Sequence, residues 1–190
     1  SYMTIGCGSG HMGGQVNFKG SIFDARIYAQ RALSAAEVAA LACSTGCAEG
    51  EERRGCGGGA PGTCVALRLD PPDHKWLLNE PAGSTTFKDT GAQGGLDGTF
   101  DASDPPVLTG HAAVFGPSGN YGARPTGTLT PDDVGTSFTL SAWIHLDCAP
   151  GTGECPKHGT ILRLSTTGTN DAIALSHEDL ASATPAGSKI

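Results

Sequence analysis

The seven cysteines are the residues whose chemistry the sequence shows most directly. They lie in segments rich in Gly and Pro, where chain-crossing disulfides are commonly placed. Disulfides persist in oxidising compartments, so we expect an extracellular protein. The disulfide candidates are Cys43, Cys47, Cys56, Cys64, Cys148 and Cys155. Because seven is odd, we expect Cys7 to be unpaired or to bond to another chain.

The spacing of the cysteines leaves their pairing open. Cys148 and Cys155 bracket a Gly/Pro loop between two predicted strands, which favours a hairpin disulfide. The four cysteines of residues 43–64 allow three connectivities. A four-thiolate zinc site is the alternative chemistry for these four. Their intervals of 3, 8 and 7 residues lack the close pairs typical of zinc sites, and this favours disulfides.

Other site chemistry has no matching pattern in the sequence. There is no Gly-x-Ser-x-Gly elbow and no phosphate-binding loop. Nucleic-acid binding needs a basic face, whereas the net charge is −7 and no basic run exceeds Arg53-Arg54. No run of about 18 apolar residues is present. We therefore expect no enzyme activity, no nucleic-acid partner and no membrane-spanning helix.

The composition favours an all-β fold. Gly 29 and Pro 12 supply the many turns that short strands need. Residues 18–28 are predicted to form a long strand. Alternation places Phe23, Ala25 and Ile27 on its core face and Ile22, Asp24, Arg26 and Tyr28 on the other.

A short helix is predicted to follow this strand, over residues 35–42. Ser34 and Glu37 form a capping box, and Leu33 and Val38 are placed to form a hydrophobic staple. Residues 43–64 contain almost no large apolar side chains and are interpreted as a cysteine-rich linker.

Strands are predicted again after the linker. The longest candidate covers residues 137–146, and the others cover residues 65–69, 75–78, 111–115, 160–164 and 172–175. In the longest one, apolar residues alternate with polar positions and with Trp143. The core-facing set is Phe138, Leu140, Ala142, Ile144 and Leu146.

Two stretches resemble laminin-G-like domains, a family of concanavalin-like jelly rolls. Residues 18–41, with Ile22-Phe23-Asp24-Ala25-Arg26-Ile27-Tyr28 followed by Arg31-Ala32-Leu33-Ser34, resemble the closing strand and final helix of the family. Leu77-Leu78-Asn79-Glu80, Asp89-Thr90-Gly91 and Ser137-Phe138-Thr139-Leu140-Ser141-Ala142-Trp143-Ile144 resemble its opening strands. The resemblance implies an antiparallel jelly-roll β-sandwich with one short helix after the closing strand.

The order of these stretches is unusual, because an ending precedes a beginning. The resemblance divides the chain into the end of one sandwich (1–42), a disulfide-rich linker (43–64) and the start of a second sandwich (65–190). Two explanations remain open. The chain is a slice of a tandem array, or it is a filament subunit in which residues 1–42 complete the sandwich of a neighbour. Both predict that its partners are adjacent repeats or other copies of itself.

The resemblance also implies a possible calcium site. Related sandwiches hold Ca²⁺ between an early loop, where Asp89 lies, and the last strand, where Asp24 is the nearest carboxylate. The last-strand ligand of such sandwiches stands three residues before the Arg, which is Phe23 here. The alternative is that Asp89 is a turn residue and that Asp24 pairs with Arg26. No cofactor is required by either interpretation.

Glycan binding is a further expectation, since sugars stack on exposed aromatic rings. Trp143 and Tyr121 are the candidates, and the alternative for Trp143 is packing between layers. The paired carboxylates of glycoside hydrolases on related jelly rolls are absent. The favoured function is a non-catalytic extracellular module with structural or cell-adhesion roles. The alternative is a carbohydrate-binding module of a surface protein or of a secreted glycoside hydrolase.

Overall fold

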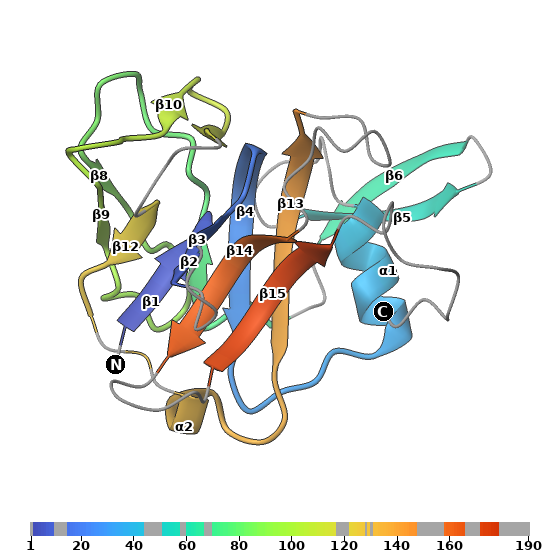
Figure 1. Ribbon diagram of the computed structural model, residues 1–190. Helices are drawn as coiled ribbons and strands as arrows, with labels where there is room; N and C mark the ends of the chain where they lie inside the picture. The colour runs from blue at the N-terminus through green and yellow to red at the C-terminus, as the bar shows by residue number, and fades with distance from the viewer. Residues whose placement is uncertain are drawn as a thin grey trace, which may run out of the picture.

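The computed structural model describes ten parts of the chain. They are residues 2–9, 15–43, 51–57, 60–66, 70–116, 122–127, 129, 131–147, 158–165 and 172–178. Most of the elements in these ranges are β-strands, and they form two main sheets, as expected for an all-β sandwich. Within the same ranges, no helix is long and apolar enough to cross a membrane. Figure 1 shows strands β14 and β15 of one sheet drawn across β4 and β13 of the other.

The first sheet has β1 near its middle. Its order is β2 (Cys7–Ser9), β3 (Gln15–Asn17), β14 (His158–Ser165), β1 (Tyr2–Ile5), β12 (Ala123–Pro125), β9 (Gly98–Phe100) and β8 (Thr86–Phe87), and β15 (Ala172–Glu178) pairs with β14. The pairing is antiparallel, except for one parallel bridge between Thr160 and Asn17. β1 pairs with β14 through Thr4 and Arg163 and with β12 through Ile5 and Ala123.

The second sheet is organised around β4. Its strands are β10 (Val107–Leu108), β11 (Ala113–Phe115), β4 (Gly20–Tyr28), β13 (Thr139–Leu146) and β7 (His74–Trp76). Ile22 of β4 lies between Ala113 of β11 and Ile144 of β13, while Arg26 lies opposite Lys75 of β7. Three strands of this sheet therefore depend on β4 for their pairing.

Residues 1–42 and 65–190 thus contribute to the same two sheets. In this single chain, strands of residues 2–43 pair with strands of the later part. The assignment of the two segments to different repeats or different copies stays a prediction.

The described part of the cysteine-rich linker forms two strands. β5 (Glu51–Gly57) and β6 (Ala60–Ala66) form a hairpin, and in the described part of the chain this hairpin pairs with neither main sheet. The residues between the two strands are Gly58-Gly59. A Gly-Gly pair between two extended segments is a recognised hairpin signal. The interpretation of residues 43–64 as a linker did not use this signal.

The predicted helix is present as α1 (Ala35–Cys43), and a short α2 covers Pro131–Val134. The capping box is confirmed: Ser34 N donates to Glu37 Oε2 at 2.7 Å, and Glu37 N donates to Ser34 Oγ at 3.3 Å. Ser34 N and Ser34 Oγ both donate to Glu37 Oε2, and these bonds, with a further one from Arg31, lower the pKa of Glu37 to about 2. The staple differs from expectation, because Leu33 packs with Tyr28 and Leu41 and Val38 is 48% exposed.

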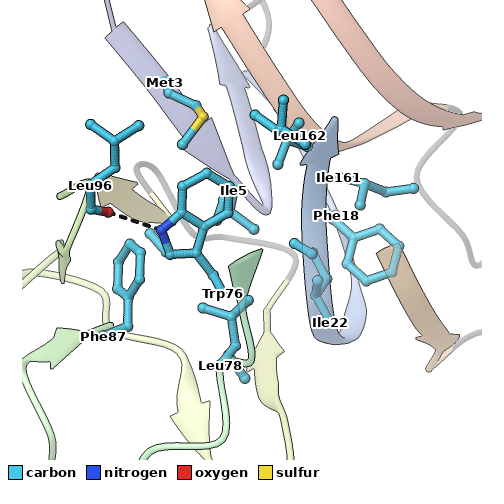
Figure 2. Close-up of a cluster of buried hydrophobic side chains, with 14 of the residues drawn as sticks. Met3, Ile5, Phe18, Ile22, Trp76, Leu78, Phe87, Leu96, Ile161 and Leu162 are labelled. Carbon is cyan, nitrogen blue, oxygen red and sulfur yellow. Dashed lines mark hydrogen bonds between the residues drawn. The ribbon is translucent and has the colours of Figure 1, made fainter. Parts of the chain in front are cut away.

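Both sheets bury their inner faces in one hydrophobic core. Figure 2 shows Trp76 between Met3 and Ile5 of β1 and the side chains of Leu78 and Phe87. Trp76 is fully buried, and its indole N–H donates to the Leu96 carbonyl at 2.9 Å. A buried indole needs such an acceptor, so the bond fixes the ring in the core.

The face assignment for β4 needs a correction. Ala25 and Ile27 lie in the core as predicted, but Ile22 takes the place of Phe23 there. The reason is a β-bulge: Asp24 and Ala25 together stand opposite the single residue Ala142 of β13. One extra residue shifts the alternation by one position, so Phe23 lies on the outer face.

Candidate functional site

A pocket lies between α1 and the strands β4 and β13. Its cavity volume is about 260 Å³. Helix α1 contributes Val38 and Leu41, and the floor is made by the two strands. The strand residues are Asp24 and Arg26 of β4 and Thr139, Leu140, Ser141, Ala142 and Trp143 of β13. Apolar walls with a few polar groups are typical of small-ligand sites.

An ion pair forms the polar part of this pocket. Arg26 Nε donates to Asp24 Oδ1 at 2.7 Å, and a second guanidinium nitrogen donates to Asp24 Oδ2. A third contact joins Arg26 to the Tyr28 hydroxyl at 3.5 Å. Burial lowers the pKa of Arg26, but the bonds to Asp24 outweigh it and raise that pKa above its ordinary value. Arg26 therefore remains charged.

The bulge gives Asp24 an unusual backbone conformation. Asp24 has a φ of 52°, in the left-handed region, and its backbone N–H donates to Leu77 O at 3.2 Å. Asp is among the few residues other than Gly that visit this region. Regular alternation already places Asp24 and Arg26 on one face; the bulge adds Phe23 to that face.

An aromatic pair lies beside the ion pair. The rings of Phe23 and Trp143 are stacked, with centroids 6.0 Å apart and planes inclined by 12°. Trp143 lies opposite the core-facing set of β13, as its alternation predicted, and it is partly exposed. Trp143 therefore borders the pocket together with Asp24. Tyr121, the other predicted glycan residue, lies outside the described residues.

Sequence reasoning missed the part that Phe23 and Thr139 play here. Phe23 was placed in the core, so its stack on Trp143 was not foreseen. Thr139 Oγ1 accepts a hydrogen bond from Leu33 N at 2.8 Å and donates to Arg31 O at 3.3 Å, which fixes the chain entering α1 above the pocket. The sequence around Thr139 gives no local signal for these two contacts, because they depend on Thr139 pairing with the distant Tyr28.

Asp89 lies in a different, closed environment. Its side chain has no exposed surface, and Oδ1 accepts from Lys75 N and Gly91 N, both at 3.0 Å. Oδ2 lies 2.7 Å from His74 Nδ1 and accepts from Leu96 N at 3.2 Å. Burial raises the pKa of Asp89, but the bonds from His74 and the backbone outweigh it and hold that pKa below its ordinary value.

The two carboxylates of the calcium prediction thus have separate partners. Four hydrogen bonds use the lone-pair positions of Asp89, and Arg26 holds Asp24. Calcium binding here would require both groups to release these donors, and the site stays a prediction. Among the described side chains, no three His, Cys, Asp or Glu residues are grouped as metal ligands.

The cysteines are described at one position. Cys64 on β6 takes part in a disulfide bond. The side chains of Cys7, Cys43, Cys47, Cys56, Cys148 and Cys155 lie outside the described part, so the pairing scheme and the zinc alternative stay predictions.

In the described part of the chain, β13 and β15 each pair with a single strand and lie at the edges of their sheets. Among the described strands, β13 pairs with β4 alone and β15 pairs with β14 alone. The core-facing residues of these two strands are only partly buried, unlike those of β4 and β14. The partly buried set is Leu140, Ala142, Ile144, Leu146, Ile173 and Leu175. Figure 1 shows both strands on the right of the sandwich.

Comparison of the chain with family models, with curated proteins and with solved structures found no match. The resemblance to laminin-G-like domains therefore rests on the sequence motifs alone.

Proposed function

We propose that this chain is a non-catalytic extracellular module with a structural or adhesive role, which associates with copies of itself by exchanging residues 2–43. The observation that carries the proposal is the position of this segment in the sheets. It supplies β1, which lies between β12 and β14, and β4, which lies between β13 and the pair of β7 and β11. The laminin-G-like, jelly-roll type of the sandwich is part of the same proposal.

The later part of the chain needs these strands from some source. In the described part, β7, β11 and β13 pair with β4 and not with one another, so removing β4 leaves their backbone groups without partners. Buried, unpaired backbone groups are costly. A neighbouring copy can make the same contacts, which is the basis of domain swapping.

The linker is a suitable hinge for this exchange. The β5–β6 hairpin stands between the exchanging segment and the later strands, and in the described part it pairs with neither main sheet. Opening the linker therefore breaks no sandwich hydrogen bond of these strands. If each copy donates its segment to the next, the contact is head-to-tail and yields rings or filaments.

Complementation between two defective variants tests this function. A Cβ at Gly20, where φ is 146°, would lie 2.1 Å from His145 O, so Gly20→Leu disables the segment. A Cβ at Gly98 would lie 2.0 Å from the Phe87 ring, so Gly98→Leu disables the later part. A Cβ at Gly116 meets no heavy atom within 4 Å, and Gly116→Ala is the control.

The readout is near-UV circular dichroism after the variants are refolded separately and together. Each defective variant alone is expected to lack the native signal, whereas the mixture recovers up to about half of it, because one intact sandwich forms per pair of chains. A mixture with no more native signal than the separate variants would contradict the proposal.

Carbohydrate binding is a second candidate function, favoured by the pocket beneath α1. A partly exposed Trp143 stands there beside a planar Asp24–Arg26 pair, which suits the apolar face and hydroxyls of a sugar ring. Val38 lines the pocket and is 48% exposed, so Val38→Trp fills the entrance without disturbing the core. Glycan-array binding that Val38→Trp abolishes would support this function; no binding by the native chain would reject it.

A further inference from the structure

Strand β13 is a long edge with one partner. The strand, Thr139–Leu146, pairs with β4 at every residue except Ala142, and in the described part of the chain no strand lies on the other side. An edge of this length presents a row of unpaired backbone N–H and C=O groups. Such an edge is a template for pairing with a further strand.

This edge lacks the features that usually prevent pairing. Thr139–Leu146 contains no Lys, Arg, Asp, Glu or Pro. The bulge between the two strands inserts its extra residue in β4, opposite Ala142, and leaves β13 regular. Charged residues, prolines and bulges are common protections of edge strands, and Thr139–Leu146 has none of them. Helix α1 borders residues 139–143 only across the pocket that it lines with them.

The inner face of β13 is less buried than that of β4. Ile22, Ala25 and Ile27 of the neighbouring β4 are fully buried, whereas Leu140 and Ile144 of β13 are only partly buried. The other sheet shows the same contrast, since Leu164 of β14 is fully buried and Ile173 of β15 is not. A strand added at β13 would remove apolar surface from water as well as pairing the backbone.

We infer that β13 is an association surface on which the β13 strand of a second copy pairs antiparallel, around a two-fold axis at Ala142. In this register Leu140 faces Ile144 on the inner side, and Ser141 faces Trp143 on the outer side. The strand is thus complementary to itself, which a two-fold interface requires. It contains no Lys, Arg, Asp or Glu, so two copies meet without strong repulsion.

This surface is distinct from the exchange of residues 2–43. The exchange uses the buried edges of β4, whereas this interface uses the outer edge of β13. Either association can therefore fail while the other holds. Ser141 lies on β13, outside residues 2–43, so its variants leave the exchanging segment unchanged.

Charge pairing at Ser141 tests the inference in the full-length chain. In the proposed register the two copies of Ser141 are diagonal neighbours, which lie within reach of long side chains. We expect Ser141→Lys or Ser141→Glu, each studied alone, to weaken association by about tenfold in analytical ultracentrifugation. We expect an equimolar mixture of the two variants to regain it as heterodimers.

Two controls separate association from folding. Val107 on β10 is 68% exposed and belongs to a different edge, so Val107→Lys and Val107→Glu should leave association unchanged. Slowed amide hydrogen exchange along residues 139–146 in the native dimer supports the interface. A native chain that stays monomeric, or a Lys/Glu mixture that does not associate better than either variant, overturns it, and so does a dimer whose β13 amides remain unprotected.

Discussion

Each of the two tryptophans lies near a carboxylate, and the two clusters serve the molecule differently. Trp76 is fully buried, donates to a backbone carbonyl and stacks on His74, which Asp89 holds. Trp143 is partly exposed, stacks on Phe23 and borders a pocket with Asp24. Every polar atom named in the first cluster has a partner inside the fold. The second cluster leaves an aromatic face and a cavity for contact with something else.

This difference separates the residues that stabilise the fold from the residues that are available for recognition. The closed cluster lies beside the inner strands, where burial and satisfied hydrogen bonds hold the sandwich together. The open cluster lies on the edge strand β13, next to the free edge of the sheet. Substitutions in the two clusters should therefore change different properties of the protein.

The largest expected effect is at Trp76. Trp76→Ala removes the largest fully buried side chain of the core and should lower the free energy of unfolding by about 3–5 kcal/mol. Chemical denaturation monitored by far-UV circular dichroism measures it. A loss as small as that of Trp143→Ala would break the contrast between the two clusters.

Asp89→Ala should follow in size. It leaves three backbone N–H groups and His74 without their acceptor in a buried place, which costs about 2–3 kcal/mol of unfolding free energy. Urea titration of this variant beside Asp101→Ala, an exposed turn carboxylate, isolates the effect of burial. Equal losses for the two variants would show that Asp89 is not the structural group described here.

The same carboxylate predicts an acid dependence. The pKa of Asp89 lies below its ordinary value of 3.8 in the folded chain. Its contribution is therefore present above that value and is lost as the pH falls below it through the folded pKa. The native chain should lose stability over this range more steeply than Asp89→Ala. Parallel slopes of thermal midpoint against pH would contradict this.

Asp24→Asn should have a moderate effect. It leaves the largely buried Arg26 guanidinium without its anionic partner, at a cost of about 1–2 kcal/mol. The matched variant is the double change Asp24→Asn with Arg26→Met, which removes the unpaired charge and should recover part of the loss. No recovery in the double variant would mean that the ion pair is not the source of the effect.

The smallest expected effect on stability is at Trp143. Trp143→Ala removes a partly exposed stack on Phe23 and should cost about 1 kcal/mol. The same change should abolish any glycan binding by the pocket. A large loss of stability with unchanged binding would reverse the assignment of the two clusters.

Much of this architecture could be predicted from local patterns. The capping box of Ser34 and Glu37 and the alternation on β13 follow from periodicity and turn chemistry. The strands predicted at residues 160–164 and 172–175 are present as β14 and β15, each somewhat longer than predicted. These signals act over a few residues, and the structure retains them.

The remaining features depend on distant partners. The bulge at Asp24 shifts Phe23 outward, and a one-residue insertion in a long strand has no local sequence signal. The pairing of β4 with β7, β11 and β13 within the chain also has no local signal, because sequence order does not state which strands share a sheet. The buried environment of Asp89 could not be predicted from the local sequence either. Its four hydrogen-bond donors come from His74, Lys75, Gly91 and Leu96.

Isotope-mixed crosslinking tests the strand-exchange account most directly. Lys19, just before β4, lies against Asp147, just after β13, with Asp147 N donating to Lys19 O. Labelled and unlabelled full-length chains are refolded together at high concentration, and Lys–carboxylate crosslinks are read by mass spectrometry. Exchange predicts that about half of the Lys19–Asp147 crosslinks join a labelled to an unlabelled chain. If every such crosslink instead joins two labelled or two unlabelled peptides, the segment stays in its own chain and exchange is contradicted.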